Sequence, residues 1–119
     1  MKKLLAIALG ATIFLSGCTT RVTDFTLSST KNYNLNSNKF IKGKRVTGEH
    51  TVPRVIIPLG APDVKTAIDK AIEPNKCVVA LSDVVVNVVD RSFIIGSFGY
   101  SVEGTEIIDR SQPGCANAN

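Results

Sequence analysis

The sequence predicts an α+β fold in which a single helix, at about residues 62–73, packs on a small mixed or antiparallel sheet. Three observations support this class. Apolar residues recur at helical spacing in one stretch, whereas β-branched residues dominate several shorter stretches. The most apolar stretch, at about 77–90, is followed by a short turn and a second stretch at about 93–103, which together predict a C-terminal β-hairpin. The chain has 119 residues, enough for one small domain.

The part of the domain before the helix is expected to form strands. Apolar residues interrupt a polar stretch at about 21–28 and favour a strand there. Residues 40–47 mix β-formers with charges, which is typical of an exposed strand. Residues 52–60 hold a β-branched run bounded by prolines that is too short for a helix, so we expect a short buried strand. Gly43 and Gly48 are expected to mark breaks.

The helix has a clear start, face and end. Pro62 suits a first helical turn, and Asp63 complements the positive end of the helix dipole. The apolar residues follow at i, i+3, i+4, i+7 and i+8, which gives one apolar face: Val64, Ala67, Ile68, Ala71 and Ile72. Pro74 then ends the helix.

The stretch at 77–90 carries valine on both faces of the expected strand. A strand of this kind is buried on both sides. We therefore expect the helix to cover one face of the sheet, and another layer or a partner to cover the other.

The N-terminus has the order of parts of a secretory signal peptide over residues 1–17. Lys2 and Lys3 precede a mainly apolar stretch from Leu4 to Leu15, which small residues follow. Polar residues arrive too early for a membrane-spanning helix, which needs about 20 apolar residues. The pattern predicts an exported chain with a single domain at 18–119.

Residues Leu15-Ser16-Gly17-Cys18 resemble the lipobox of bacterial lipoproteins. The resemblance implies that Cys18 receives a diacylglycerol on its sulfur, becomes the first residue after cleavage and is acylated on its new amino group. Two or three acyl chains make attachment to a membrane effectively permanent. Thr19 stands where an Asp retains Gram-negative lipoproteins at the inner membrane, so the resemblance implies the outer membrane, facing the periplasm. The alternative is an ordinary signal peptide with a coincidental cysteine.

Short motifs across the domain carry a second resemblance. They are Asp24-Phe25-Thr26, Ser29-Thr30-Lys31-Asn32, Ile57-Pro58-Leu59-Gly60, Ala67-Ile68-Asp69-Lys70-Ala71-Ile72-Glu73, Leu81-Ser82-Asp83-Val84-Val85-Val86 and Val102-Glu103-Gly104-Thr105. In these motifs the chain resembles a family of small proteobacterial lipoproteins of uncharacterised function. The resemblance implies an envelope location and does not imply an activity.

Export changes the expected chemistry of the other cysteines. The periplasm oxidises thiols, and with Cys18 lipidated only Cys77 and Cys115 remain to pair. A disulfide between them is therefore expected to stabilise the domain. The alternative is a buried Cys77 beside a free Cys115 in a loose tail.

The charge of the chain gives no support to nucleic-acid binding. Because Lys2 and Lys3 belong to the expected signal peptide, the remaining chain has 12 basic and 10 acidic residues, a formal charge of +2. The densest basic run, at 39–45, contains the single aromatic Phe40, whereas nucleic-acid binding requires basic residues with aromatic stacking platforms. We expect a solvated strand face or a membrane-proximal surface there.

The sequence offers few candidates for chemistry. His50 is the single histidine and lacks a nucleophile motif beside it, so we expect a structural role and no enzyme. The spacing of histidine and cysteine matches no metal site, and no cofactor is expected. Glu103, Glu106 and Asp109 are expected to form a solvated strand end. The polar segment Ser29-Thr30-Lys31-Asn32 is a candidate recognition loop, although turn chemistry also explains it.

These expectations favour a non-enzymatic lipoprotein anchored to the membrane through Cys18. It would bind another envelope protein through a sheet edge or through the face left by the helix. One alternative is a surface-exclusion or phage-immunity lipoprotein that occludes an outer-membrane receptor. A second alternative is an enzyme that uses His50.

Overall fold

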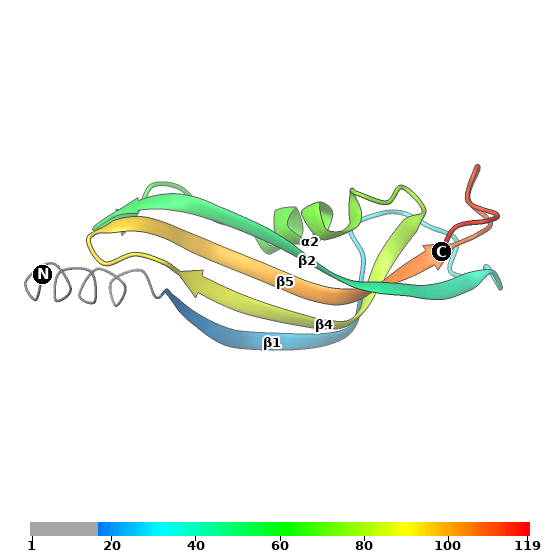
Figure 1. Cartoon of the computed structure of the whole chain (residues 1–119), viewed down its shortest axis with the longest axis horizontal. Coiled ribbons are helices and arrows are strands. Elements are labelled where there is room, and N and C mark those ends of the chain that lie inside the picture. The colour runs from blue at the N-terminus through cyan, green and yellow to red at the C-terminus, as the bar shows by residue number, and fades with distance from the viewer. Residues whose placement is uncertain (1–16) are drawn as a thin grey trace, which may run out of the picture.

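The computed structural model describes residues 17–119 and shows a five-stranded antiparallel sheet with one short helix among them (Figure 1). The strands lie in the order β1-β4-β5-β2-β3. The elements are β1 (Cys18–Ser28), β2 (Phe40–Val55), β3 (Ile57–Pro58), α2 (Val64–Ile72), β4 (Val78–Asp90) and β5 (Ile95–Asp109). The expected signal peptide, apart from Gly17, lies outside the described residues.

The predicted α+β class is wrong, because the domain is β-rich. Its four long strands have 11, 16, 13 and 15 residues, whereas the helix has nine. The strands are also longer than expected: β5 continues six residues beyond position 103, and β2 runs through both of its glycines. The sheet therefore extends well past the helix in Figure 1.

Strand β2 is continuous because its glycines and its proline each fit the sheet. A Cβ on Gly48 would lie 2.0 Å from the Ala67 carbonyl oxygen and 2.5 Å from the Ala71 nitrogen, so glycine lets the helix lie directly on the strand. Gly43 lies within a register shift between β2 and β5. Pro53 has no N–H, but its carbonyl accepts a hydrogen bond of 2.8 Å from the Leu59 N–H.

The helix α2 covers part of one face of the sheet. Asp63 caps its N-terminus and accepts hydrogen bonds from the backbone N–H groups of Lys65 and Thr66 at 3.1 and 3.0 Å. The apolar face of α2 packs into a core that β2, β4 and β5 complete. The buried residues of this core are Ala67, Ile68, Ala71, Ile72, Cys77, Val78, Leu81, Val84, Val86, Val102, Ile108 and Cys115.

The opposite face of the sheet is mainly polar, although it also holds apolar residues such as the buried Val89 of β4. Because neighbouring residues on a strand point to opposite faces, Glu103 faces away from the core residue Val102. Glu103 pairs there with Arg45, and Arg91 pairs with Glu49 at 2.6 Å. A second covering layer is not seen among residues 17–119, so the expectation that β4 is buried on both faces by packed elements is not confirmed.

The predicted disulfide between Cys77 and Cys115 is confirmed. It joins the start of β4 to the C-terminal segment, 38 residues further along the chain. Both cysteines are buried, at 5% and 1% exposure. The guanidinium of Arg110 donates a hydrogen bond of 3.0 Å to the Ala118 carbonyl, so the C-terminal segment is held against the domain at two points.

Candidate functional site at the Cys18 end of the sheet

Cys18 lies near one end of the sheet. It is the first residue of β1 and pairs in register with Asp90, the last residue of β4. Its side chain is exposed, and it is the free cysteine of the chain. Through the register pairs of neighbouring strands, Cys18 is level with Phe98 of β5 and Val52 of β2, so it lies near one end of the sheet, and β5 and β2 continue a few residues beyond it.

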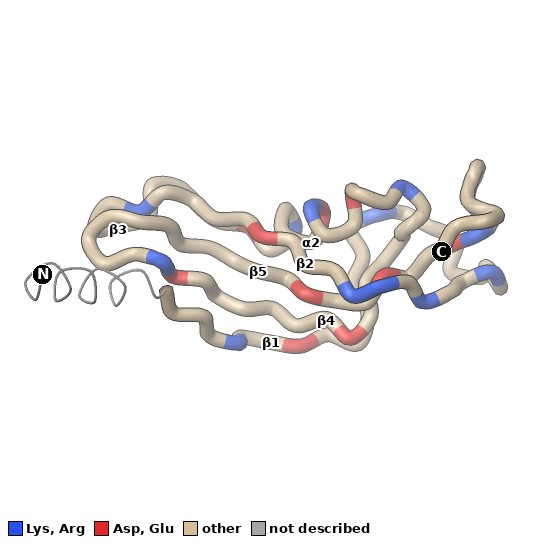
Figure 2. Tube along the Cα trace, viewed as in Figure 1, with Lys and Arg blue, Asp and Glu red and all other residues tan. Residues whose placement is uncertain are grey.

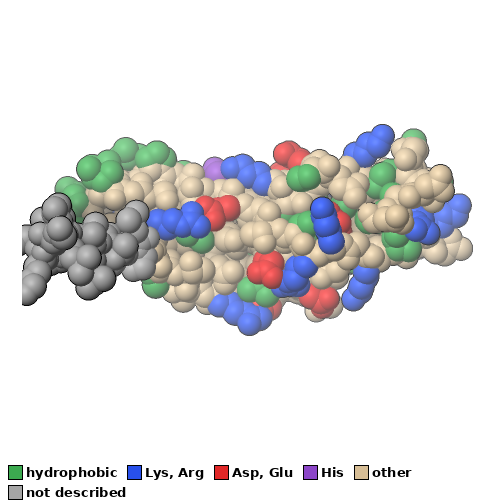
Figure 3. Space-filling view, in the orientation of Figure 1, with side chains coloured by type: hydrophobic (Ala, Val, Ile, Leu, Met, Phe, Trp, Pro, Cys, Tyr) green, Lys and Arg blue, Asp and Glu red, His purple; other side chains and the backbone are tan. Residues whose placement is uncertain are grey.

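A group of exposed apolar side chains lies at the same end, and we call it the apolar tip. It comes from the turn between β2 and β3 and from the turn between β4 and β5, at the left of Figure 1. Figure 3 shows hydrophobic side chains gathered at this end. The apolar tip consists of Val55, Ile56, Ile57, Leu59, Phe93, Ile94 and Ile95, which are 43–83% exposed.

The two turns of the apolar tip are joined. Val55 pairs in register with Ile95, and the Ile56 N–H donates a hydrogen bond of 2.8 Å to the Ile94 carbonyl. The sequence predicted a short buried strand over residues 52–60, and this prediction is wrong: none of these residues is buried, and the run is divided between the end of β2 and the two-residue β3. These residues lie beyond the part of the sheet that α2 covers, so the domain does not bury them.

Ile56 has a strained backbone. Its φ is +64°, in the left-handed region that β-branched residues rarely adopt. Its side chain is 74% exposed, so packing of that side chain does not compensate for the strain. Such conformations persist where the surrounding structure imposes them, and they concentrate at functional sites.

Charges are confined to the base of the apolar tip. Residues 55–62 and 92–102 contain no charged side chain, as Figure 2 shows for the two turns. At the base, Arg54 pairs with Asp90 at 2.5 Å, and its guanidinium lies 5.8 Å from the ring centroid of Phe98. A hydrogen bond from Ser92 is the main cause that lowers the pKa of Asp90, and Arg54 lowers it further. The hydrogen bond to Glu49 raises the pKa of Arg91. Both arginines are therefore paired with acids.

The exposed edge of β1 forms a second surface. All residues of β1 except the half-buried Ser28 are exposed, including the apolar Val22, Phe25 and Leu27. Strand β1 pairs with β4 on one side, and within the described residues no strand pairs with its other side. Beside it an open cavity of about 400 Å³ is lined by Arg21, Asp24, Phe25, Thr26, Arg45, Asp83, Val84 and Val85.

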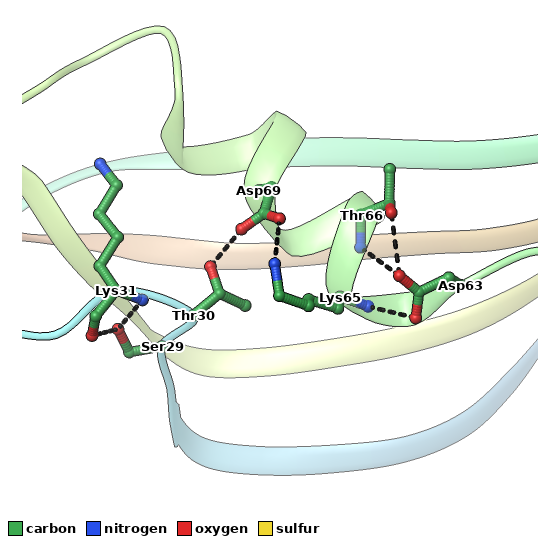
Figure 4. Close-up of polar contacts among 7 residues, drawn as sticks. All are labelled: Ser29, Thr30, Lys31, Asp63, Lys65, Thr66 and Asp69. Atoms are coloured by element: carbon green, nitrogen blue, oxygen red, sulfur yellow. Dashed lines mark hydrogen bonds and ion pairs between the residues drawn. The ribbon is translucent and has the colours of Figure 1, made fainter.

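The predicted recognition loop makes contacts within the domain (Figure 4). The Ser29 hydroxyl donates to the Val79 carbonyl at 2.5 Å, and the Lys31 ammonium donates to the Val78 carbonyl at 2.9 Å. The Thr30 hydroxyl donates to Asp69 on α2. The pKa of Asp69 is lowered, first by the hydrogen bond from Lys65 and then by that from Thr30.

These contacts give the loop a structural role, since they join the end of β1 to β4 and α2. Asn32 remains exposed. A recognition role for Ser29, Thr30, Lys31 and Asn32 stays a prediction.

His50 lies on β2, beside the start of α2. Its Nδ1 accepts a hydrogen bond of 3.0 Å from the Asp63 backbone N–H. Asp63 in turn caps the helix, and the hydrogen bond from the Thr66 hydroxyl is the main cause that lowers its pKa. His50 thus helps to hold the first turn of α2 on the sheet.

The prediction of a solvated strand end at Glu103, Glu106 and Asp109 is wrong for the last two, because both are buried on β5. Glu106 is 2% exposed and accepts a hydrogen bond of 3.3 Å from the Lys44 backbone N–H. Asp109 is fully buried, and its Oδ1 accepts from the Ser37 and Ser111 hydroxyls at 3.0 and 2.6 Å. The pKa of Asp109 is lowered, mainly by the hydrogen bond from Ser111. These carboxylates hold the chain segments at the end of the sheet opposite Cys18.

The comparisons with known proteins gave no match. No family model, no curated protein and no solved structure is significantly similar to the chain. Within residues 17–119, no three or more His, Cys, Asp or Glu side chains are grouped to hold a metal ion. In the same residues, no helix has the length and hydropathy needed to cross a membrane.

Proposed function

We propose that this chain is a non-enzymatic lipoprotein of the cell envelope, anchored through lipid on Cys18 to the outer membrane and facing the periplasm. The observation that carries the proposal is the position of Cys18, because the lipobox cysteine is exposed and lies near one end of the sheet. A lipid attached there would leave the core, the disulfide and the helix undisturbed.

The anchored domain binds another envelope protein through the exposed edge of β1. An exposed strand edge presents N–H and C=O groups that can pair with a strand of another chain. The apolar side chains of Val22, Phe25 and Leu27 lie along this edge and would add specificity to the pairing. We prefer this function to an enzyme based on His50, because the Nδ1 of His50 is engaged with the start of α2.

Photo-crosslinking in cells tests the binding function. A photoreactive phenylalanine analogue replaces Phe25, an exposed residue of β1, and in a control variant it replaces Thr47, an exposed residue of β2, which lies three strands away from β1 in the sheet. The expected result is a reproducible adduct with an envelope protein from position 25 and none from position 47. Equal adducts from both positions, or none from position 25, would contradict binding through the β1 edge.

A further inference from the structure

We propose that the apolar tip enters the lipid interface beside the acyl chains on Cys18 and so forms a second contact with the membrane. This inference rests on the lipid anchor of the proposed function and adds an orientation to it. The strands of the sheet are roughly perpendicular to the membrane surface, and the end that carries Cys18 contacts the membrane.

The first argument is the composition of the apolar tip. Several exposed large apolar side chains gather there, and Ile56, Ile57 and Ile95 are 74%, 65% and 72% exposed. Contiguous apolar surface of this kind marks an interaction site. Because the two turns carry no charge, no ion pair has to be broken or desolvated when the apolar tip leaves water.

The second argument is the distance from the anchor. Strands β1, β4, β5 and β2 are neighbours in that order, and adjacent strands lie about 4.8 Å apart, so Cys18 and Val52, the residue of β2 level with it, are separated by roughly 15 Å. The end of β2 at Val55 lies about 10 Å beyond that level along the strand. Asp90 pairs with Cys18, and Ile94 follows only four residues later. Acyl chains on Cys18 would therefore bring the apolar tip to the membrane surface, which makes lipid the partner that this surface meets first.

The third argument concerns the polar groups of the apolar tip. Hydrogen bonds of 2.8 Å already join the Ile56 N–H to the Ile94 carbonyl and the Leu59 N–H to the Pro53 carbonyl. Backbone groups that have partners within the protein can enter an apolar environment at lower cost. Arg54 and Arg91 pair with acids at the base, so the ion pairs remain in the headgroup layer while the apolar side chains reach about 5–10 Å further.

The strain at Ile56 fits the same role. Asparagine or glycine would adopt its φ of +64° more readily than isoleucine. The isoleucine therefore lowers the stability of the fold and supplies exposed apolar surface. A lipid-facing position explains this combination, because the side chain is buried when the domain is on the membrane.

This orientation places the rest of the domain. Strand β5 has 15 residues and spans roughly 45–50 Å, so the disulfide end projects by about that distance from the membrane. The β1 edge then stands upright and is exposed to the periplasm along its length.

The test uses single tryptophans as depth reporters, since the chain contains no natural tryptophan. Lipidated full-length protein carrying Ile94→Trp is reconstituted on vesicles of phosphatidylethanolamine and phosphatidylglycerol, with or without brominated acyl chains. The matched control is Leu35→Trp, because Leu35 is also exposed, at 73%, and lies in the loop between β1 and β2, away from the apolar tip. Cosedimentation with the vesicles reports the anchor, and quenching by bromine reports the contact of the apolar tip.

The expected result is that both variants cosediment, and that bromolipid quenches Ile94→Trp but not Leu35→Trp. Adding Ile56→Asp and Ile57→Asp to Ile94→Trp should remove the quenching while cosedimentation persists, because each substitution lowers the inserted fraction about tenfold or more. Cosedimentation without quenching at position 94 would overturn the inference and leave the anchor intact. A blue-shifted but unquenched Ile94→Trp would overturn it in favour of a protein partner, such as a second copy of the chain. Loss of cosedimentation in both variants would contradict the lipid anchor itself, and the inference with it.

Discussion

Removal of the disulfide is expected to destabilise the domain more than any surface substitution. In the double variant Cys77→Ala/Cys115→Ala, the unfolded chain gains the freedom of a loop that the bond now closes over a sequence separation of 38 residues. The chain-entropy relation gives about 4 kcal/mol for a loop of this length. A domain of this size has a free energy of unfolding of about 5–15 kcal/mol, so the bond supplies a large share of it.

Urea unfolding of residues 18–119 with Cys18→Ser, compared with the same chain carrying the two alanines, measures this effect. With a slope of about 1–2 kcal/mol per molar urea, the midpoint should fall by about 2–4 M. Reduction of the parent protein should cause a similar fall, whereas it should not change the double variant. A loss of unfolding free energy below about 1 kcal/mol would refute the reasoning, because it would mean that the bond does not restrict the unfolded chain as the chain-entropy relation assumes.

Three further substitutions test the local account. Gly48→Ala places a Cβ 2.0 Å from the Ala67 carbonyl oxygen, so α2 must shift, and thermal unfolding should show a loss of about 2 kcal/mol or more; an unchanged midpoint would contradict the close approach of helix and strand. Ile56→Asn relieves the left-handed backbone at an exposed site and should raise the free energy of unfolding by up to about 1 kcal/mol, and a loss of stability would show that Ile56 is packed in the free domain. The pKa of Asp109 is lowered on folding, so its ionised form stabilises the domain above the unfolded pKa of about 4, and this stability is lost as pH falls through the lower folded pKa. Asp109→Asn should therefore lower the melting temperature at neutral pH, and the melting temperature of the variant should decrease less than that of the parent as the pH is lowered. If the melting temperatures of the two proteins decreased equally with pH, this prediction would be contradicted.

Local signals in the sequence located the helix but placed its start about two residues too early, because Pro62 was expected in the first helical turn and lies before the Asp63 cap. Asp63 precedes the first apolar position of the helical pattern, and it caps α2 in the structure. The predicted fold class was wrong because glycine and proline, which usually interrupt a strand, do not interrupt β2. Gly48 is a site of helix contact, and the ladder continues past Pro53, so two short expected strands form one of 16 residues.

Burial could not be deduced from hydrophobicity alone. The β-branched run at 52–60 prefers burial, but its last residues lie where the described part of the domain supplies no covering element, so Ile56 and Ile57 are exposed. The reverse error concerns Glu106, which was expected at a solvated strand end and is buried. Strand alternation offered the missing signal, because Glu106 is in phase with the core residues Val102 and Ile108.

The disulfide was predictable because two cysteines were left to pair once the sequence was interpreted as that of an exported lipoprotein. The apolar tip was not predictable, since it depends on two turns that are 38 residues apart at Ile56 and Ile94 and that meet only when β2 and β5 pair. Strand β1 was identifiable from the sequence, but its position at the edge of the sheet was not, because that position depends on the order of the strands.

The proposed function requires that the mature protein begins at a lipidated Cys18. Mass spectrometry of the protein purified from envelope membranes tests this most directly. We expect an N-terminal peptide that starts at Cys18 and carries a diacylglycerol and an amide-linked acyl chain, and we expect Cys18→Ser to remove the protein from the membrane fraction. An N-terminal peptide that starts at another residue, with an unmodified thiol at Cys18, would contradict it.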